Sequence, residues 1–196
     1  MYMNSRAQVV ADRLISTFGV HCQKIIVAGS LRRGAERVKD VEIVALPKYY
    51  LDLFGEESDQ DELSDAVRTE MAEGRLRWRH IESKSNGAHA SKVTNQRRYM
   101  AVQDTKTGIP VDLFIVRPPA NYFWQLMIRT GPAEYSKWLV NQPKMFGWTC
   151  ENGAVWRPTV DSMGDLDGTL TPVEFTSEKH VCETLGIAYL KPRDRK

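Results

Sequence analysis

Two acidic residues, Asp40 and Glu42, stand one residue apart in the otherwise apolar stretch "DVEIVALP". Because side chains alternate between the two faces of a strand, both carboxylates face one side, opposite Val41 and Ile43. Asp112 interrupts the apolar stretch "PVDLFIV" in the same manner. Carboxylates are the ligands that Mg²⁺ and Mn²⁺ prefer, and two such ions about 3.5–4 Å apart stabilise a phosphoryl transfer. The acids therefore predict a two-metal site, with exposed acids on an edge strand as the alternative.

A Gly-Ser turn followed by two arginines precedes the acid pair, in "GSLRRG". A glycine turn from a strand into a helix exposes backbone N–H groups, and a helix start favours an anion. Ser30 adds a hydroxyl donor, and Arg32 or Arg33 can bind phosphate oxygens with two parallel hydrogen bonds. Together with the acids, the turn predicts a site for a nucleoside triphosphate and its metal ions.

The elements that position these residues follow from hydrophobic periodicity. The pattern predicts helices at residues 4–18 and 59–73, the latter ended by Gly74, and strands in "KIIVAGS", "DVEIVALP", "LRWRHIESK", "RRYMAVQDT" and "IPVDLFIVRPP". Further on it predicts helices in "ANYFWQLMIRTG", "PAEYSKWLVNQ" and "SEKHVCETLGI", and a hairpin in "FGWTCENGAVWR" that turns at Asn152-Gly153. The pattern predicts an α+β fold: a mixed sheet with helices on one face, followed by a smaller lobe.

Composition narrows the class of protein. The chain has 196 residues, a net charge of +2 and three cysteines. The cysteines form no CxxC pair, which favours a reducing cytoplasm over a disulfide framework. No apolar run approaches the length of a membrane span, which is about 20 residues. Residues 49–73 carry nine acids against one base, whereas residues 75–106 carry eight bases against two acids. Such a basic run indicates either a phosphate-backbone contact or an ordinary solvated surface.

The motif "GSLRRGAERVKDVE" resembles that of the DNA polymerase X family, which reads Gly-Ser-x-x-Arg-Gly followed by Asp-x-Asp. The likeness continues in "IPVDLFIVRPPANYFWQLMIRTGPAEYSKWL", "FGWTCENGAVW" and "TPVEFTSEKHVCETLGIAYLKPRDR", so it covers nearly the whole chain. The resemblance implies a nucleotidyltransferase palm at residues 1–118 and a thumb of helices and a β-hairpin at residues 119–196. It leaves no room for the lyase and DNA-grasping domains that precede the palm in larger members.

The resemblance also implies roles for single residues. It implies that Asp40, Glu42 and Asp112 are the metal ligands and catalytic acids, with Asp112 nearest the primer 3′-hydroxyl. Its nucleotide-binding residues are Gly29, Ser30, Arg33, Thr130, Gly131, Tyr135 and Lys137, and its DNA-contacting residues are Arg97 and Arg98. The implied cofactor is a pair of Mg²⁺ ions, or Mn²⁺. The implied partners are a dNTP and a primer–template or gapped DNA. The expected protein is a cytoplasmic monomer, or lies in the host cytoplasm or virion if it is viral.

This sequence departs from the family pattern at three positions. Glu42 stands where the polymerases have Asp, Arg129 precedes Thr130 where larger members place an aromatic residue, and Val140 replaces a template-contacting arginine. The leading prediction is a template-directed DNA polymerase that fills gaps in DNA repair. The alternatives are template-independent or ribonucleotide addition, transfer to another acceptor, and a degenerate protein that only binds nucleic acid.

Overall fold

A computed structural model describes residues 1–51, 54, 57–79, 98–160 and 163–195. The chain forms two compact units, Met1–Ile115 and Val116–Lys196. In the described residues, no helix has both the length and the apolar character needed to cross a membrane.

The first unit is built on a five-stranded mixed sheet in the order β2-β4-β9-β8-β7. These strands are β2 (Cys22–Val27), β4 (Val41–Pro47), β9 (Pro110–Ile115), β8 (Tyr99–Asp104) and β7 (Leu76–Trp78). The central pair, β4 and β9, is parallel, and the other neighbouring pairs are antiparallel. Segments far apart in the sequence therefore lie next to each other at the centre of the sheet.

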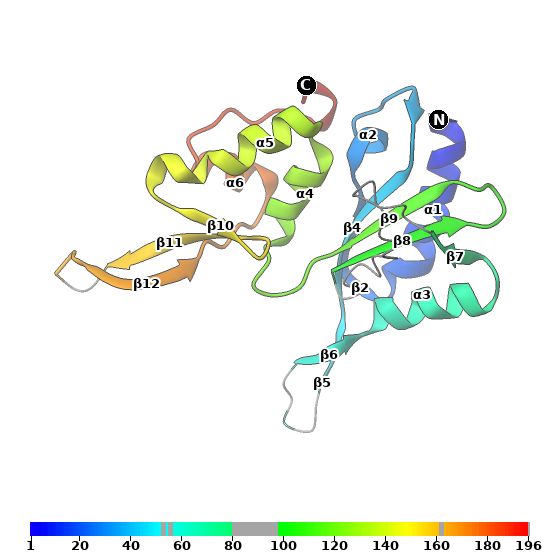
Figure 1. Ribbon diagram of the computed structural model, residues 1–196, viewed down its shortest axis with the longest axis horizontal. Coiled ribbons are helices and arrows are strands. Elements are labelled where there is room, and N and C mark those ends of the chain that lie inside the picture. Colours follow the sequence, from blue (N-terminus) through cyan, green and yellow to red (C-terminus); the bar gives the residue numbers. More distant parts are fainter. Residues whose placement is uncertain (52–53, 55–56, 80–97, 161–162, 196) are drawn as a thin grey trace, which may run out of the picture. The chain divides into compact units, whose positions relative to one another are not determined.

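One face of this sheet carries the core of the first unit. Helices α1 (Asn4–Gly19) and α3 (Glu62–Ala72) cover that face (Figure 1). Leu14 and Phe18 of α1 and Leu63 of α3 are fully buried against Ile43 of β4 and Leu113 of β9. Burying each such side chain contributes about 1.5–3 kcal/mol, which fixes the register of the strands. Residues at alternate positions of the same strands, Glu42 and Asp112 among them, must then face the other side.

Short elements complete the first unit. They are β1 (Tyr2–Met3) paired with β3 (Arg37–Val38), the short helix α2 (Gly29–Arg32), and β5 (Tyr49–Leu51) paired with β6 (Glu57–Asp61). The helix expected from residue 59 begins at Glu62 instead, because Asp61 caps it by accepting a hydrogen bond from the Ser64 N–H at 2.7 Å. The residues before it pair as a strand with β5.

The second unit combines helices with a three-stranded antiparallel sheet. The helices are α4 (Tyr122–Thr130), α5 (Ala133–Asn141), η1 (Pro143–Phe146), α6 (Glu178–Thr184) and η2 (Pro192–Asp194), and the strands are β10 (Thr149–Glu151), β11 (Ala154–Val160) and β12 (Leu166–Pro172). Trp124, Met127, Leu139 and Val181 are buried at its core. The predicted turn at Asn152-Gly153 is confirmed, since both residues have the positive φ angles of a tight hairpin, 52° and 83°.

The fold agrees with the predicted α+β class, a mixed sheet with its helices on one face. The strand β12 was not predicted. Leu166 and Leu170 are exposed and Gly168 breaks the strand pattern, so the sequence there lacks the alternation of a half-buried strand.

Candidate active site

The central pair of strands brings two of the predicted acids together. Glu42 on β4 and Asp112 on β9 are direct partners in the parallel register, and Asp40 lies one residue before β4 begins. All three side chains are partly exposed, whereas their neighbours Val41 and Val111 are fully buried. The acids therefore face away from the helices.

The row that contains Glu42 and Asp112 continues across two more strands. Ala101 on β8 is the partner of Asp112. Arg79 follows β7 and extends its pairing by one residue, since its N–H donates to the Ala101 carbonyl at 3.0 Å. Glu42, Asp112, Ala101 and Arg79 thus stand side by side across β4, β9, β8 and the end of β7. This row places one cation and two acids on the same face.

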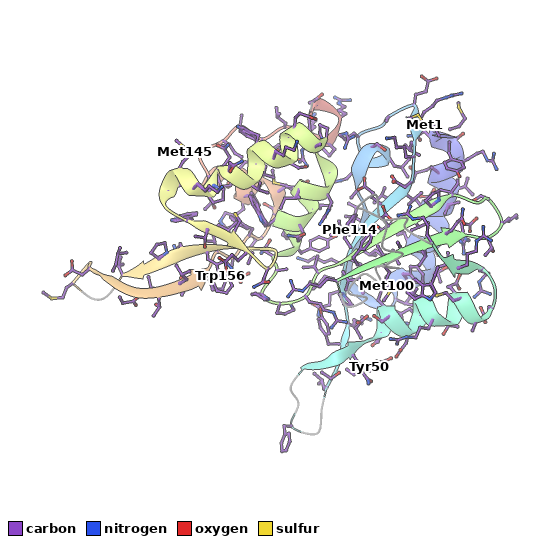
Figure 2. The ribbon with its side chains drawn as sticks, in the orientation of Figure 1. Met1, Tyr50, Met100, Phe114, Met145 and Trp156 are labelled. Atoms are coloured by element: carbon purple, nitrogen blue, oxygen red, sulfur yellow. The ribbon has the colours of Figure 1, made fainter. Side chains whose placement is uncertain are left out.

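Arg79 and Tyr99 both bind the carboxylate of Asp112. Arg79 Nη2 donates to Asp112 Oδ1 in an ion pair, and the Tyr99 hydroxyl donates to the same oxygen at 2.8 Å. The ring of Tyr99 stacks on Phe114, which Figure 2 labels, with 5.3 Å between ring centroids. Burial, and then the hydrogen bond to Asp112, raise the pKa of Tyr99 to about 12. Tyr99 therefore remains a hydrogen-bond donor across the physiological pH range.

Burial and the negative charge of Asp112 raise the pKa of Asp40 above its ordinary value. Nearby positive charges on Arg79 and Lys39 oppose this shift, as smaller contributions. The ionised form of Asp40 is thus disfavoured in the metal-free protein because a second carboxylate lies close by. A cation bound between the carboxylates would remove this cost.

Glu42 extends toward the Gly-Ser turn. A Cβ atom added to Gly29 would lie 1.5 Å from Glu42 Oε2, and Gly29 has a φ angle of +61°. Only glycine fits there without a shift of the Glu42 carboxylate or backbone strain. The Ala28 N–H donates to the Glu42 carbonyl at 2.7 Å, which ties the start of the turn to β4. The turn and the acid are therefore in contact, with partly exposed Ser30 next along the chain.

The three acids match Mg²⁺ or Mn²⁺ in the chemistry of their donors, since all are carboxylate oxygens on one side of the sheet. Among the described residues, however, no three His, Cys, Asp or Glu side chains gather closely enough to hold a metal ion. The metal site at Asp40, Glu42 and Asp112 therefore remains a prediction. Asp112 pairs with Arg79, and Glu42 lies against Gly29. Side-chain rotation would be needed to bring the acids together.

The remaining predicted residues of the first unit lie in different surroundings. Arg33 follows α2 and is partly exposed, with its N–H donating to the Gly29 carbonyl at 3.2 Å. Arg98 is partly exposed, and its carbonyl accepts a hydrogen bond from the Ile115 N–H at 3.0 Å. Arg97 lies outside the described residues.

The predicted nucleotide residues of the second unit divide into buried and exposed ones. Thr130 ends α4 and is fully buried, and Lys137 on α5 is exposed. Tyr135 differs from the expectation that its ring faces a base, because it is only 5% exposed and packs in the core of this unit. A Cβ at Gly131 would lie 2.3 Å from the ring of Tyr135, so the glycine lets the turn approach that ring closely.

Arg79 and Tyr99 are the site residues that the sequence analysis did not single out. Arg79 counted only as one base of a charged run. Alternation in "LRWRH" and "RRYMAVQD" assigns each residue to a face, but the register of three strands, β7, β8 and β9, is needed to place Arg79 and Tyr99 beside Asp112.

Comparison with known proteins shows which solved structure has a similar fold. No protein-family model matches this chain, and no curated protein matches it. Among solved structures, it is similar to the polymerase beta of Leishmania infantum, crystallised as a ternary P/T complex, with a TM-score of 0.68 and 13% sequence identity. The similarity covers 100% of this chain and 76% of that one. The chain therefore has a polymerase beta-like fold along its whole length.

Proposed function

We propose that this protein is a nucleotidyltransferase that adds dNMP from a dNTP to a primer 3′-hydroxyl, as in gap-filling DNA repair. The observation that carries the proposal is the register of the central strands. It sets Glu42 beside Asp112 on one face of the sheet, with Asp40 two residues away and the Gly29 turn in contact with Glu42. A polymerase beta-like fold around these acids supports the same activity.

In this proposal Asp40, Glu42 and Asp112 hold two Mg²⁺ ions. The ions, when bound, supply the positive charge that stabilises the attacking and leaving oxygens of the transfer. Asp112 lies nearest the primer 3′-hydroxyl and directs its proton away as the new bond to the α-phosphorus forms. The bond between the α- and β-phosphates breaks, and pyrophosphate leaves. Ser30 and Arg33 bind the triphosphate beside the Gly29 turn.

The second unit, residues 119–196 in this assignment, provides the thumb. Gly131, which follows the buried Thr130, forms the floor of the sugar pocket, and exposed Lys137 contacts the base or the template. Tyr135 supports Gly131 from the core of the unit rather than contacting the nucleotide. Arg97 and Arg98 contact the primer strand through its phosphates.

The test is primer extension on gapped, recessed and single-stranded DNA with each dNTP or NTP, in Mg²⁺ or Mn²⁺. We expect extension on gapped DNA with dNTPs, and we expect Asp112→Asn to reduce the rate by at least ~100-fold, since even outer-shell partners of a metal cost about 10–100-fold. Asp12→Asn, which removes a carboxylate on the exposed side of α1, is the matched control and retains the wild-type rate. Extension by Asp112→Asn at the wild-type rate contradicts the site assignment.

The same panel separates the alternatives within the enzyme class. Extension of single-stranded DNA without a template indicates terminal addition, and equal use of NTPs indicates ribonucleotide transfer. Arg129 stands before Thr130 where larger members of the family have an aromatic residue. The comparison of dNTPs with NTPs is therefore the most informative part of the panel.

A protein that binds nucleic acid without catalysis is the second candidate. The observation that favours it is the Arg79–Asp112 ion pair, together with the lack of a gathered acid cluster in the described residues. This candidate predicts salt-sensitive DNA binding without extension in either metal. Retention of an acid at all three ligand positions favours the enzyme.

A further inference from the structure

Whether the Arg79 side chain can reach Asp112 depends on the size of the residue between them, Ala101. Neighbouring strands lie about 4.8 Å apart, so Arg79 and Asp112, two strands apart, have backbones about 10 Å apart. Ala101 stands between them in the same row. Its side chain is a single methyl group, which leaves room for the long side chain of Arg79 to reach Asp112 Oδ1.

The ion pair is well shielded from water. The Arg79 side chain is 24% exposed and that of Asp112 is 13% exposed. Among the described residues, Arg79 and Tyr99 both donate to Oδ1 of the Asp112 carboxylate. Such a pair is screened less than one at the open surface, so its charge acts strongly on the neighbouring carboxylates.

The positive end of Arg79 is its guanidinium, which donates to Asp112 Oδ1. A guanidinium stays protonated at every physiological pH. Its positive charge therefore remains at the site unless the side chain rotates away.

We propose that Arg79 is a built-in counter-ion of the carboxylate site, which takes the place of a divalent cation at Asp112 in the metal-free protein and competes with it. This inference rests on the metal site of the proposed function. It makes Arg79 a positioning residue that acts on the site through Asp112.

The test measures Mn²⁺ binding to the full-length protein by electron paramagnetic resonance, without DNA or nucleotide. We expect Arg79→Gln to bind Mn²⁺ at least about fivefold more tightly than wild type, because the competing positive charge is gone. Arg79→Lys keeps the charge, and its affinity stays within about twofold of wild type. Tyr99→Phe, which removes only the neutral donor to the same oxygen, also stays within about twofold.

Thermal unfolding gives a readout that does not depend on activity. Without metal, Arg79→Gln melts at a lower temperature than wild type, because the carboxylates lose their counter-ion. Saturating Mn²⁺ raises its melting temperature by more than it raises that of wild type. Ala101→Val is a second variant, which hinders Arg79 from reaching Asp112 while all charges remain. We expect it to tighten Mn²⁺ binding as well.

Two outcomes overturn the inference. If Asp112→Asn abolishes Mn²⁺ binding but neither Arg79→Gln nor Ala101→Val tightens it, the metal site stands and Arg79 is no competitor. If neither wild type nor Arg79→Gln binds Mn²⁺ in an Asp112-dependent manner, both the inference and the metal site of the proposed function fail.

Discussion

The two faces of the central sheet each carry acids held by arginine, but in different ways. On the helix-covered face, Arg13 of α1 donates to Glu70 at 3.1 Å and to Asp104 at 2.6 Å, and Arg75 donates to Glu70 at 2.9 Å. Asp104 Oδ1 accepts two further hydrogen bonds, from the Thr107 N–H at 2.8 Å and its hydroxyl at 2.6 Å. Both oxygens of this acid are thus engaged.

On the opposite face the acids are held differently. Among the described residues, Arg79 and Tyr99 both donate to Asp112 Oδ1, and the pKa of Asp40 is raised by burial and then by the charge of Asp112. Charges that are paired and hydrogen-bonded hold a fold together, whereas acids that repel each other cost stability. The Glu70–Asp104 cluster is therefore a structural one, whereas Asp40 and Asp112 belong to the site of the proposed function.

The largest effect is expected from breaking the structural cluster. Arg13→Ala leaves the buried carboxylates of Glu70 and Asp104 without the cation that joins them. We expect a loss of about 3 kcal/mol in the free energy of unfolding, toward the lower end for buried pairs because the Arg13 side chain is 35% exposed. Urea unfolding measures this loss. A change below about 0.5 kcal/mol, within the range of ordinary surface substitutions, would remove the structural role.

A smaller effect is expected at the contact between Gly29 and Glu42. Gly29→Ala costs about 1–2 kcal/mol from its positive φ alone, and its Cβ also displaces the Glu42 carboxylate. Glu42→Asp shortens that side chain and relieves the second cost. A double-mutant cycle by urea unfolding therefore shows Gly29→Ala to be less damaging in the Glu42→Asp background. If Gly29→Ala reduces the free energy of unfolding equally in both backgrounds, the Glu42 side chain does not contact the Gly29 turn.

The smallest effect is expected at Asp40, where the substitution increases stability rather than reducing it. Because the pKa of Asp40 is raised in the folded protein, the folded state binds this proton more readily than the unfolded state does. Its contribution therefore reduces stability as the pH rises above the unfolded-state pKa of about 3.9. In metal-free protein at about pH 7, Asp40→Asn raises the melting temperature, and the gain shrinks as the pH approaches 4. A variant less stable than wild type at neutral pH contradicts this prediction.

The sequence was most informative where one residue type decides the local structure. The apolar alternation around Glu42 and Asp112 predicted their strands, and Asn152-Gly153 predicted a hairpin. The parallel pairing of β4 with β9 was not predictable, since residues 48–109 separate the two strands and no local pattern sets their register. For the same reason, the sequence did not distinguish Arg79 from the other bases of residues 75–106.

Other differences come from packing. The resemblance to the DNA polymerase X family made Tyr135 a candidate for contact with the nucleotide. Its ring instead packs beside Trp138, with 5.4 Å between ring centroids, and belongs to the same buried cluster as Leu139 and Val181. Burial of an aromatic ring contributes more than its single polar atom costs, so a core position prevails.

If Arg79 competes with a metal ion as proposed, Ala101 separates metal affinity from the proposed chemistry. A substitution of a proposed metal ligand alters both, whereas a substitution of Ala101 alters only how easily Arg79 reaches Asp112. Changes in the volume of this one side chain would adjust how much free metal the protein requires while the catalytic groups stay as they are. Adaptation to a metal-poor or metal-rich surrounding could therefore proceed in single, reversible steps at this position.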